Sequence, residues 1–181
     1  MAALTRDGNV LGALSLVVAD QMSDAVAAAA DQSLTAAAAL SALEQFADGC
    51  SIDRLRRILG LTSSGTVRLV DRLVAAGDVR RSEGPDARTT SVALTAAGRR
   101  AARRVTTARA VVLEEALGTL SLGERRDLER LAARVLDGLV RQKLAREAES
   151  TRWICRLCDT GACGRAEGRC PAANAAASAR G

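Results

Sequence analysis

Apolar residues recur at helical spacing through most of this chain. Between Val10 and about Ala30 they fall at positions 10, 11, 14, 17, 18 and 22, on one broad face of a helix. The segment SLTAAAALSALEQFADG then predicts a second helix, with Ser33 or Thr35 as its N-cap and Gly49 at its end. The residues of this second helix that should point inward are Leu40, Leu43 and Phe46.

Two shorter helices follow, separated by a tight turn. In SIDRLRRILGL, Ser51 is the expected N-cap and Gly60 the end, and SSGTVRLVDRLVAAG predicts a further helix that Gly77 closes. Two short helices joined by a glycine-containing turn form a helix-turn-helix. Cys50, which stands alone beside the first cap, is interpreted as a small buried residue.

After Gly77 the apolar spacing becomes that of strands. DVRRS and TTSVALT alternate with a period of two, and the turn-forming EGPDAR lies between them. A β-hairpin directly after a helix-turn-helix makes a winged helix. Thr95 should cap a helix over about 97–117, and Ser121 with Glu124 should form a capping box for the last long helix. The apolar seam of that last helix comprises Leu128, Leu131, Val135 and Leu139.

These patterns predict a mainly α fold with a small β-hairpin wing: a winged helix-turn-helix on a helical dimerisation domain. The outer helices carry more apolar surface than a small winged domain can cover, so a second copy of the chain is expected to bury it. We expect four regions: an N-terminal dimerisation helix (1–32), a winged helix-turn-helix domain (33–96), C-terminal dimerisation helices (97–150) and a cysteine-rich tail (151–181).

Charge is distributed unevenly along the chain. Residues 1–52 carry one basic and six acidic side chains, whereas residues 53–109 carry thirteen basic and five acidic ones, a local net charge of +8. Nearly all the basic residues are arginines, which looks like codon bias, but codon bias does not explain the clustering. A basic block of this kind is typical of a surface that faces nucleic acid.

No segment reaches the roughly 18 unbroken apolar residues that a membrane helix needs. The apolar run NVLGALSLVVA is short, lies between Asp7 and Asp20, and lacks the cleavage site of a signal peptide. We therefore expect no membrane partner and a cytoplasmic protein whose thiols stay reduced.

The segments LTAAAALSALEQF, SIDRLRRILGLTSSGTVRLVDRLVAAGDVRR and GPDARTTSVALTAAGRR resemble the multiple-antibiotic-resistance regulator (MarR) family of bacterial transcription factors. The resemblance runs from about Leu34 to Arg104, and its most specific element is the wing, where Asp86 and Arg88 stand before SVALTAAG. It implies a homodimer, acting as a repressor, that binds palindromic operators in double-stranded DNA. In this family the protein is usually released from DNA by a small-molecule ligand or an oxidant.

The expected recognition helix runs from Ser63 to Ala76. Its inward face should hold Val67, Val70 and Val74 with Leu73 beside them, leaving Ser64, Arg68 and Arg72 on another face. Arg68 can reach a base edge, whereas Arg72 is expected to contact phosphate. Two further hydroxyl residues near the start of the helix, expected to approach phosphates closely, are Ser63 and Thr66.

The wing supplies the remaining candidates for DNA contact. Arg88 at its tip suits the minor groove, whose negative potential attracts a guanidinium group. The family resemblance implies that Asp86 holds that guanidinium in place. Arg81, on the first wing strand, is expected to contact phosphate.

Four of the five cysteines lie near the C-terminus with the spacing C-x2-C-x4-C-x6-C: Cys155, Cys158, Cys163 and Cys170. Four thiolates with glycines between them suit a tetrahedral zinc ion, which would supply the folding energy of so small a segment. An iron–sulfur cluster uses the same four ligands, and two reversible disulfides would make the tail an oxidant sensor. The typical MarR-family member lacks such a tail, so the resemblance assigns it no role.

The chain contains no histidine, which excludes Ser-His and Cys-His nucleophile pairs and a His-ligated catalytic zinc. Four cysteines would also fill the coordination of zinc and leave no open position for a substrate. We therefore expect no enzyme. A protein-interaction module built on a winged helix is the alternative, and the +8 segment with its wing arginine argues against it.

Overall fold

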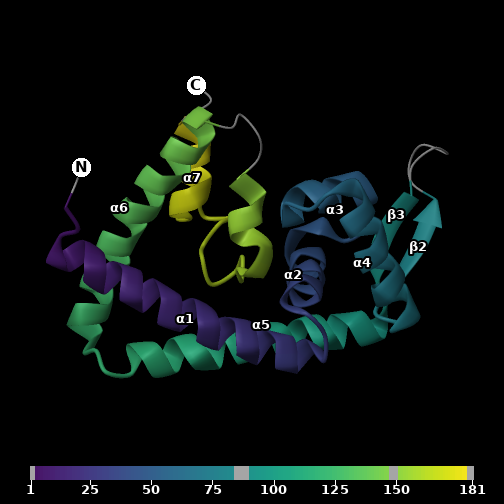
Figure 1. Cartoon of the computed structure of the whole chain (residues 1–181), viewed down its shortest axis with the longest axis horizontal. Coiled ribbons are helices and arrows are strands. Elements are labelled where there is room, and N and C mark those ends of the chain that lie inside the picture. The colour runs from purple at the N-terminus through teal and green to yellow at the C-terminus, as the bar shows by residue number, and fades with distance from the viewer. Residues whose placement is uncertain (1–2, 84–89, 147–150, 179–181) are drawn as a thin grey trace.

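The structure, a computed structural model, describes residues 3–83, 90–146 and 151–178 (Figure 1). It is mostly helical with a small three-stranded antiparallel sheet, as the sequence predicts. In chain order the elements are α1 (Arg6–Ala30), α2 (Leu34–Ala42), the π-helical turn η1 (Leu43–Ala47), β1 (Cys50–Ser51), α3 (Ile52–Leu59), α4 (Ser63–Ala75), β2 (Val79–Glu83), β3 (Thr90–Leu94), α5 (Ala96–Leu117), α6 (Leu122–Arg146), the 3-10 helix η2 (Thr151–Leu157) and α7 (Pro171–Ser178).

Side-chain caps fix the starts of the helices. Ser33, Ser51 and Thr95 each accept a hydrogen bond from the backbone N–H three residues later, at 3.1–3.3 Å. At the start of α6 the capping box is reciprocal: Glu124 N–H donates to Ser121 Oγ at 3.4 Å, and Ser121 N–H donates to Glu124 Oε2 at 2.8 Å. These predicted caps are confirmed, and each satisfies backbone donors that a helix start leaves without partners.

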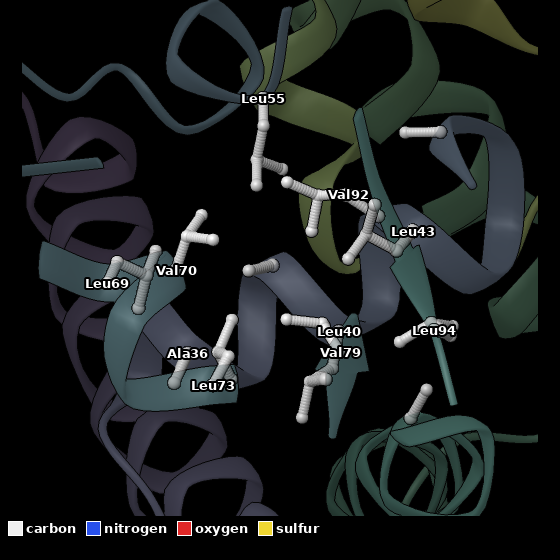
Figure 2. Close-up of a cluster of buried hydrophobic side chains, with 14 of the residues drawn as sticks. Ala36, Leu40, Leu43, Leu55, Leu69, Val70, Leu73, Val79, Val92 and Leu94 are labelled. Carbon is white, nitrogen blue, oxygen red and sulfur yellow. The ribbon is translucent and has the colours of Figure 1, made fainter. Parts of the chain in front are cut away.

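The main core of the winged helix surrounds α2, of which seven of nine residues are buried (Figure 2). Four of these are consecutive alanines, Ala36–Ala39, so neighbouring elements approach α2 closely. The large buried side chains of this core are Leu40, Leu43, Leu55, Ile58, Leu69, Val70, Leu73, Val79, Val92 and Leu94. Cys50 belongs to the same cluster, which confirms its interpretation as a small buried residue.

The sheet has the strand order β1-β3-β2, with both pairings antiparallel. Pairing of β2 with β3 is the predicted hairpin, in register from Val79 opposite Leu94 to Glu83 opposite Thr90. The two-residue strand β1 was not predicted; its Cys50 lies opposite Val92. It fastens the loop after α2 to the base of the wing.

The start of α5, directly after strand β3, packs against the backbone of the two residues that precede β2. Thr95 N–H donates to the Asp78 carbonyl oxygen at 2.9 Å, and Thr95 Oγ1 donates to the Gly77 carbonyl oxygen at 2.7 Å. A Cβ added to Gly98 would lie 2.0 Å from that Asp78 oxygen, far inside contact distance. Only glycine therefore permits this approach.

The outer helices leave a broad apolar surface uncovered. α1 runs beside α5, and α6 rises from the far end of that pair (Figure 1). The large exposed apolar residues of the two outer helices are Val10, Leu11, Leu14, Leu16 and Val17 on α1, and Leu122, Leu128, Leu131, Val135 and Leu139 on α6. By length and composition α1 could cross a membrane, although its inner end packs on α5 through Val26 and Ala30.

The tail folds into two short helical pieces, η2 and α7, which the sequence pattern does not predict. It lies between α6 and the α2–α3 part of the winged helix (Figure 1). η2 contacts α2 and α3, whereas α7 lies along α6. The last part of the chain therefore touches both the helical body and the winged helix.

Candidate nucleic-acid interface and cysteine cluster

α4 turns one face into the core through Thr66, Leu69, Val70 and Leu73. This corrects the predicted inward face, because Val67 and Val74 are 42% and 38% exposed. It also corrects the placement of Thr66 at the surface. Thr66 is fully buried, and its hydroxyl donates to the Thr62 carbonyl oxygen at 2.9 Å, so its side chain has no surface to offer to DNA.

The opposite face of α4 is exposed and carries the other predicted contacts. Ser63, Ser64, Arg68 and Arg72 all lie on it, together with Val67. Thr62 caps this helix by accepting from Gly65 N–H at 3.2 Å, which leaves the first backbone N–H groups directed outward. The outward N–H groups at the start of α4, together with two arginines one turn apart on the same helix, are suited to binding the phosphates of a nucleic acid.

The first wing strand is tied to α4. Arg81 Nη2 lies 2.7 Å from Asp71 Oδ1, so this arginine, which we predicted as a phosphate contact, joins β2 to α4. Because both side chains are partly exposed, the pair contributes little to stability. Asp86 and Arg88 lie at positions outside the residues that the structure describes.

A network of ion pairs holds α5 to η1 and to the residue that follows it. Arg99 binds Glu44 and Asp48, and Arg103 Nε lies 3.4 Å from Glu44 Oε1. Asp48 also accepts from Leu94 N–H at 2.9 Å, which connects the network to the sheet. These side chains thus position the winged helix on α5. Beside them an open groove is lined by Arg100, Arg103, Arg104, Thr107 and Ala108.

The four tail cysteines form two pairs in the structure. Cys158 lies beside Cys155, and Cys163 lies beside Cys170. The Cys158 thiol donates to the Ile154 carbonyl oxygen at 3.7 Å, and the Cys163 thiol donates to the Thr160 carbonyl oxygen at 3.5 Å. The two pairs are close enough for Cys163 to interact electrostatically with Cys155 and Cys158. Arg165 Nη1 donates to Cys155 Sγ at 3.5 Å, and so links the middle of the tail to the first pair.

The surroundings of the cysteines raise the pKa of two of the thiols. For Cys158 the causes of the raised pKa are the hydrogen bond with Cys155, then burial and the neighbouring thiolate charge. For Cys163 burial raises the pKa most, followed by the charge of Cys170. The direction of both pKa shifts favours the protonated thiol at these two positions.

Among residues 3–83, 90–146 and 151–178, no three Cys, Asp or Glu side chains already converge as a metal site. The predicted ligands are brought together as two pairs rather than as one tetrahedron. A metal ion would therefore have to draw Cys155 and Cys158 toward Cys163 and Cys170.

One contact at this site has no signal in the sequence. The Gln45 side-chain carbonyl, on η1, accepts from Thr160 N–H at 2.9 Å and from Thr160 Oγ1 at 2.8 Å. Neither residue belongs to a pattern, and 115 positions separate them, so only the folded chain reveals the pair. It joins the cysteine tail to the winged helix.

The helix-turn-helix, the wing strands and the exposed arginines of α4 together define a winged helix-turn-helix protein. The model of the MarR family matches residues 31–89, which extend from the end of α1 into the wing. Over these residues the sequence is similar to that of the MarR family. The matched segment stops well before the four tail cysteines.

Three solved structures of similar fold illustrate the likeness. A probable transcriptional regulator from Pseudomonas aeruginosa is 28% identical, with a TM-score of 0.54 over 68% of this chain and 95% of the other. Apo MarR from Escherichia coli is 24% identical, with a TM-score of 0.58 over 69% and 96%. MepR, a transcription regulator of the Staphylococcus aureus multidrug efflux pump MepA, is 18% identical, with a TM-score of 0.64 over 75% and 98%. The curated proteins contain no match to this sequence.

Proposed function

We propose that this protein is a cytoplasmic, non-enzymatic transcription regulator that binds palindromic operator DNA as a homodimer and represses the genes behind it. The observation that carries the proposal is the exposed face of α4, where Arg68 and Arg72 stand one turn apart beside Ser63 and Ser64. The opposite face of α4 is anchored in the core, so these side chains are held at fixed positions. A recognition helix of this kind fits the major groove.

The homodimer is supported by the uncovered apolar surface of α1 and α6. Leu14 is 51% exposed and Leu131 is 49% exposed, and each lies in a row of exposed apolar residues. Apolar rows of this length normally lie against a partner. A two-fold dimer would present two α4 helices to two half-sites, which is why we propose a palindromic operator.

Two further parts of the proposal concern what the protein could bind or sense besides DNA. A small-molecule ligand is proposed as a further partner, in keeping with the family. The four-cysteine tail is proposed as a metal or redox site, where zinc, an iron–sulfur cluster and reversible thiol oxidation are the chemistries open to four cysteines.

The proposal is tested by DNA binding of the full chain. An operator is first selected from random-sequence duplexes, and affinity is then measured by fluorescence anisotropy at several salt concentrations. Arg68→Ala should weaken binding to the selected site by about 1–3 kcal/mol and relax its preference at one base pair. Arg72→Ala should instead weaken binding to all sequences alike and reduce the salt slope by about 1.

Arg126→Ala is the matched control, because Arg126 is an exposed arginine on α6 rather than on α4. It should leave affinity and salt slope unchanged. Failure to select any duplex, or binding that does not respond to salt, would count against DNA binding and favour the protein-interaction alternative.

A further inference from the structure

The cysteine tail connects two parts of the protein that α6 alone would leave apart. Beyond α6, η2 lies against α2 and α3, and α7 lies along α6 (Figure 1). The tail is thus attached at both ends, and its cysteines lie between the attachments. We call residues 151–178 the strap.

The first half of the strap is attached mainly to the winged helix and the α1–α5 pair, while Ile154 at its start packs on the α6–α7 cluster. Leu157 packs against the small buried cluster of Val26, Ala30, Ala37 and Val105, contributed by α1, α2 and α5. Three residues later, Thr160 makes its two hydrogen bonds to Gln45 on η1. Cys155 and Cys158, the first pair, belong to this half.

The second half of the strap is attached to α6. Ala172, Ala175 and Ala176 of α7 are buried against Val140, with Leu136 and Leu144 at the edge of the same cluster. Cys170 is buried in this cluster as well, and Cys163 packs against it. The second cysteine pair is therefore fixed to the outer helices.

The stretch between the two attachments has almost no core of its own. Along residues 156–169, all of which the structure describes, Gly164 is the one buried position. Gly164 and Gly168 adopt positive φ angles of 62° and 68°, which let the chain fold back tightly between the cysteines. Burial of apolar surface cannot hold such a segment in one shape, so small domains of this type rely on a cross-link or a metal.

We propose that Cys155, Cys158, Cys163 and Cys170 bind one zinc ion per chain, and that this ion fastens the strap between α6 and the winged helix. Sulfur ligands in fours favour zinc in tetrahedral coordination, and the two pairs supply two ligands from each half. Each ligand releases its thiol proton to solvent on binding. Arg165, which contacts Cys155, and Arg109 near Cys158 offset part of the resulting negative charge.

The regulatory part of this inference rests on the proposed DNA binding. Because the pairs do not already converge, zinc must draw the α6-bound half toward the half held by Gln45 and Leu157. The strap then fixes the winged helix relative to the dimer helices. A winged helix that is already fixed loses less freedom on binding DNA, so zinc should tighten DNA binding.

The site itself is tested on the full chain purified without air. Elemental analysis should give about one zinc per chain, and replacement by cobalt should give the thiolate charge-transfer and d–d absorption of a tetrahedral site. Cys155→Ser and Cys170→Ser should each lose the metal, whereas Cys50→Ser, which alters the core cysteine, should keep it. Iron with sulfide, disulfides in the mass spectrum, or zinc retained in both tail variants would each overturn the site.

The coupling is tested by hydrogen exchange and by DNA affinity. Removal of zinc with a chelator should speed exchange in η2, α2 and α3, and should weaken DNA binding by about 5- to 150-fold, the usual range of coupling between sites. Gln45→Ala should keep the zinc and still weaken DNA binding. Unchanged exchange and affinity after zinc removal would overturn the coupling. If the wild-type chain binds zinc but no DNA, the proposed function is contradicted and the zinc site is not. Metal content and hydrogen exchange test the zinc site without reference to DNA.

Discussion

Replacing Gly98 with alanine is expected to destabilise the winged helix by about 3 kcal/mol, the upper part of the range for overpacked cores. The new Cβ would lie 2.0 Å from the Asp78 carbonyl oxygen and 2.8 Å from its carbonyl carbon. Neither atom can move freely, because Asp78 accepts from Thr95 N–H and the adjoining Val79 is paired with Leu94. For a chain of this length, thermal unfolding should fall by about 10 °C.

Gly138 provides the matched control for this change. It lies in the middle of α6, and nothing lies within 4 Å of the position that its Cβ would take. Gly138→Ala should therefore leave stability unchanged or raise it by about 0.5–1 kcal/mol, because alanine favours a helix. Equal melting temperatures for the two variants would show that α5 does not approach Asp78 this closely.

Replacing Leu131 with glutamate is expected to convert the proposed homodimer into monomers and to abolish the proposed operator binding. Burial of one leucine contributes about 1.5–3 kcal/mol to the free energy of association. In a two-fold dimer each substitution occurs in both chains, so its effect on the interface is doubled. The dimer dissociation constant should therefore rise by about 100-fold or more. Leu131 is half exposed in the single chain, so the fold of each monomer should survive.

Molar mass from light scattering during gel filtration measures the first effect, and circular dichroism verifies the fold. Arg126→Glu places the same new carboxylate on the side of α6 away from the seam and should remain dimeric. If Leu131→Glu stays dimeric with intact DNA binding, the two chains do not meet along α6.

Patterns of residues close together in the sequence predicted most of the helices and strands. Helix caps such as Ser51, Thr95 and the Ser121–Glu124 box depend on residues three positions apart, so the sequence alone reveals them. The hairpin was equally visible from its alternation. Fold class, helix order and the winged helix were therefore predictable from local patterns alone.

The candidate site was predictable only in part. Hydrophobicity placed Val67 and Val74 inward, yet the face with Thr66 and Leu69 is the buried one. Thr66 can be buried because its hydroxyl donates a hydrogen bond to the Thr62 carbonyl oxygen. A hydrophobicity pattern treats threonine as polar and therefore does not predict this burial. The strap escaped prediction for another reason, since its contact between Thr160 and Gln45 depends on the folding of the whole chain.

The buried alanines of α2 have a mechanical consequence. Residues 36–42 are enclosed, with α1, α5, α3 and η2 all in contact with this one helix. Four short methyl side chains leave no slack between these neighbours, because protein interiors are packed at the density of crystals. A displacement of any one neighbour therefore requires the others to shift, so α2 couples the outer helices α1 and α5, the strap and the winged helix.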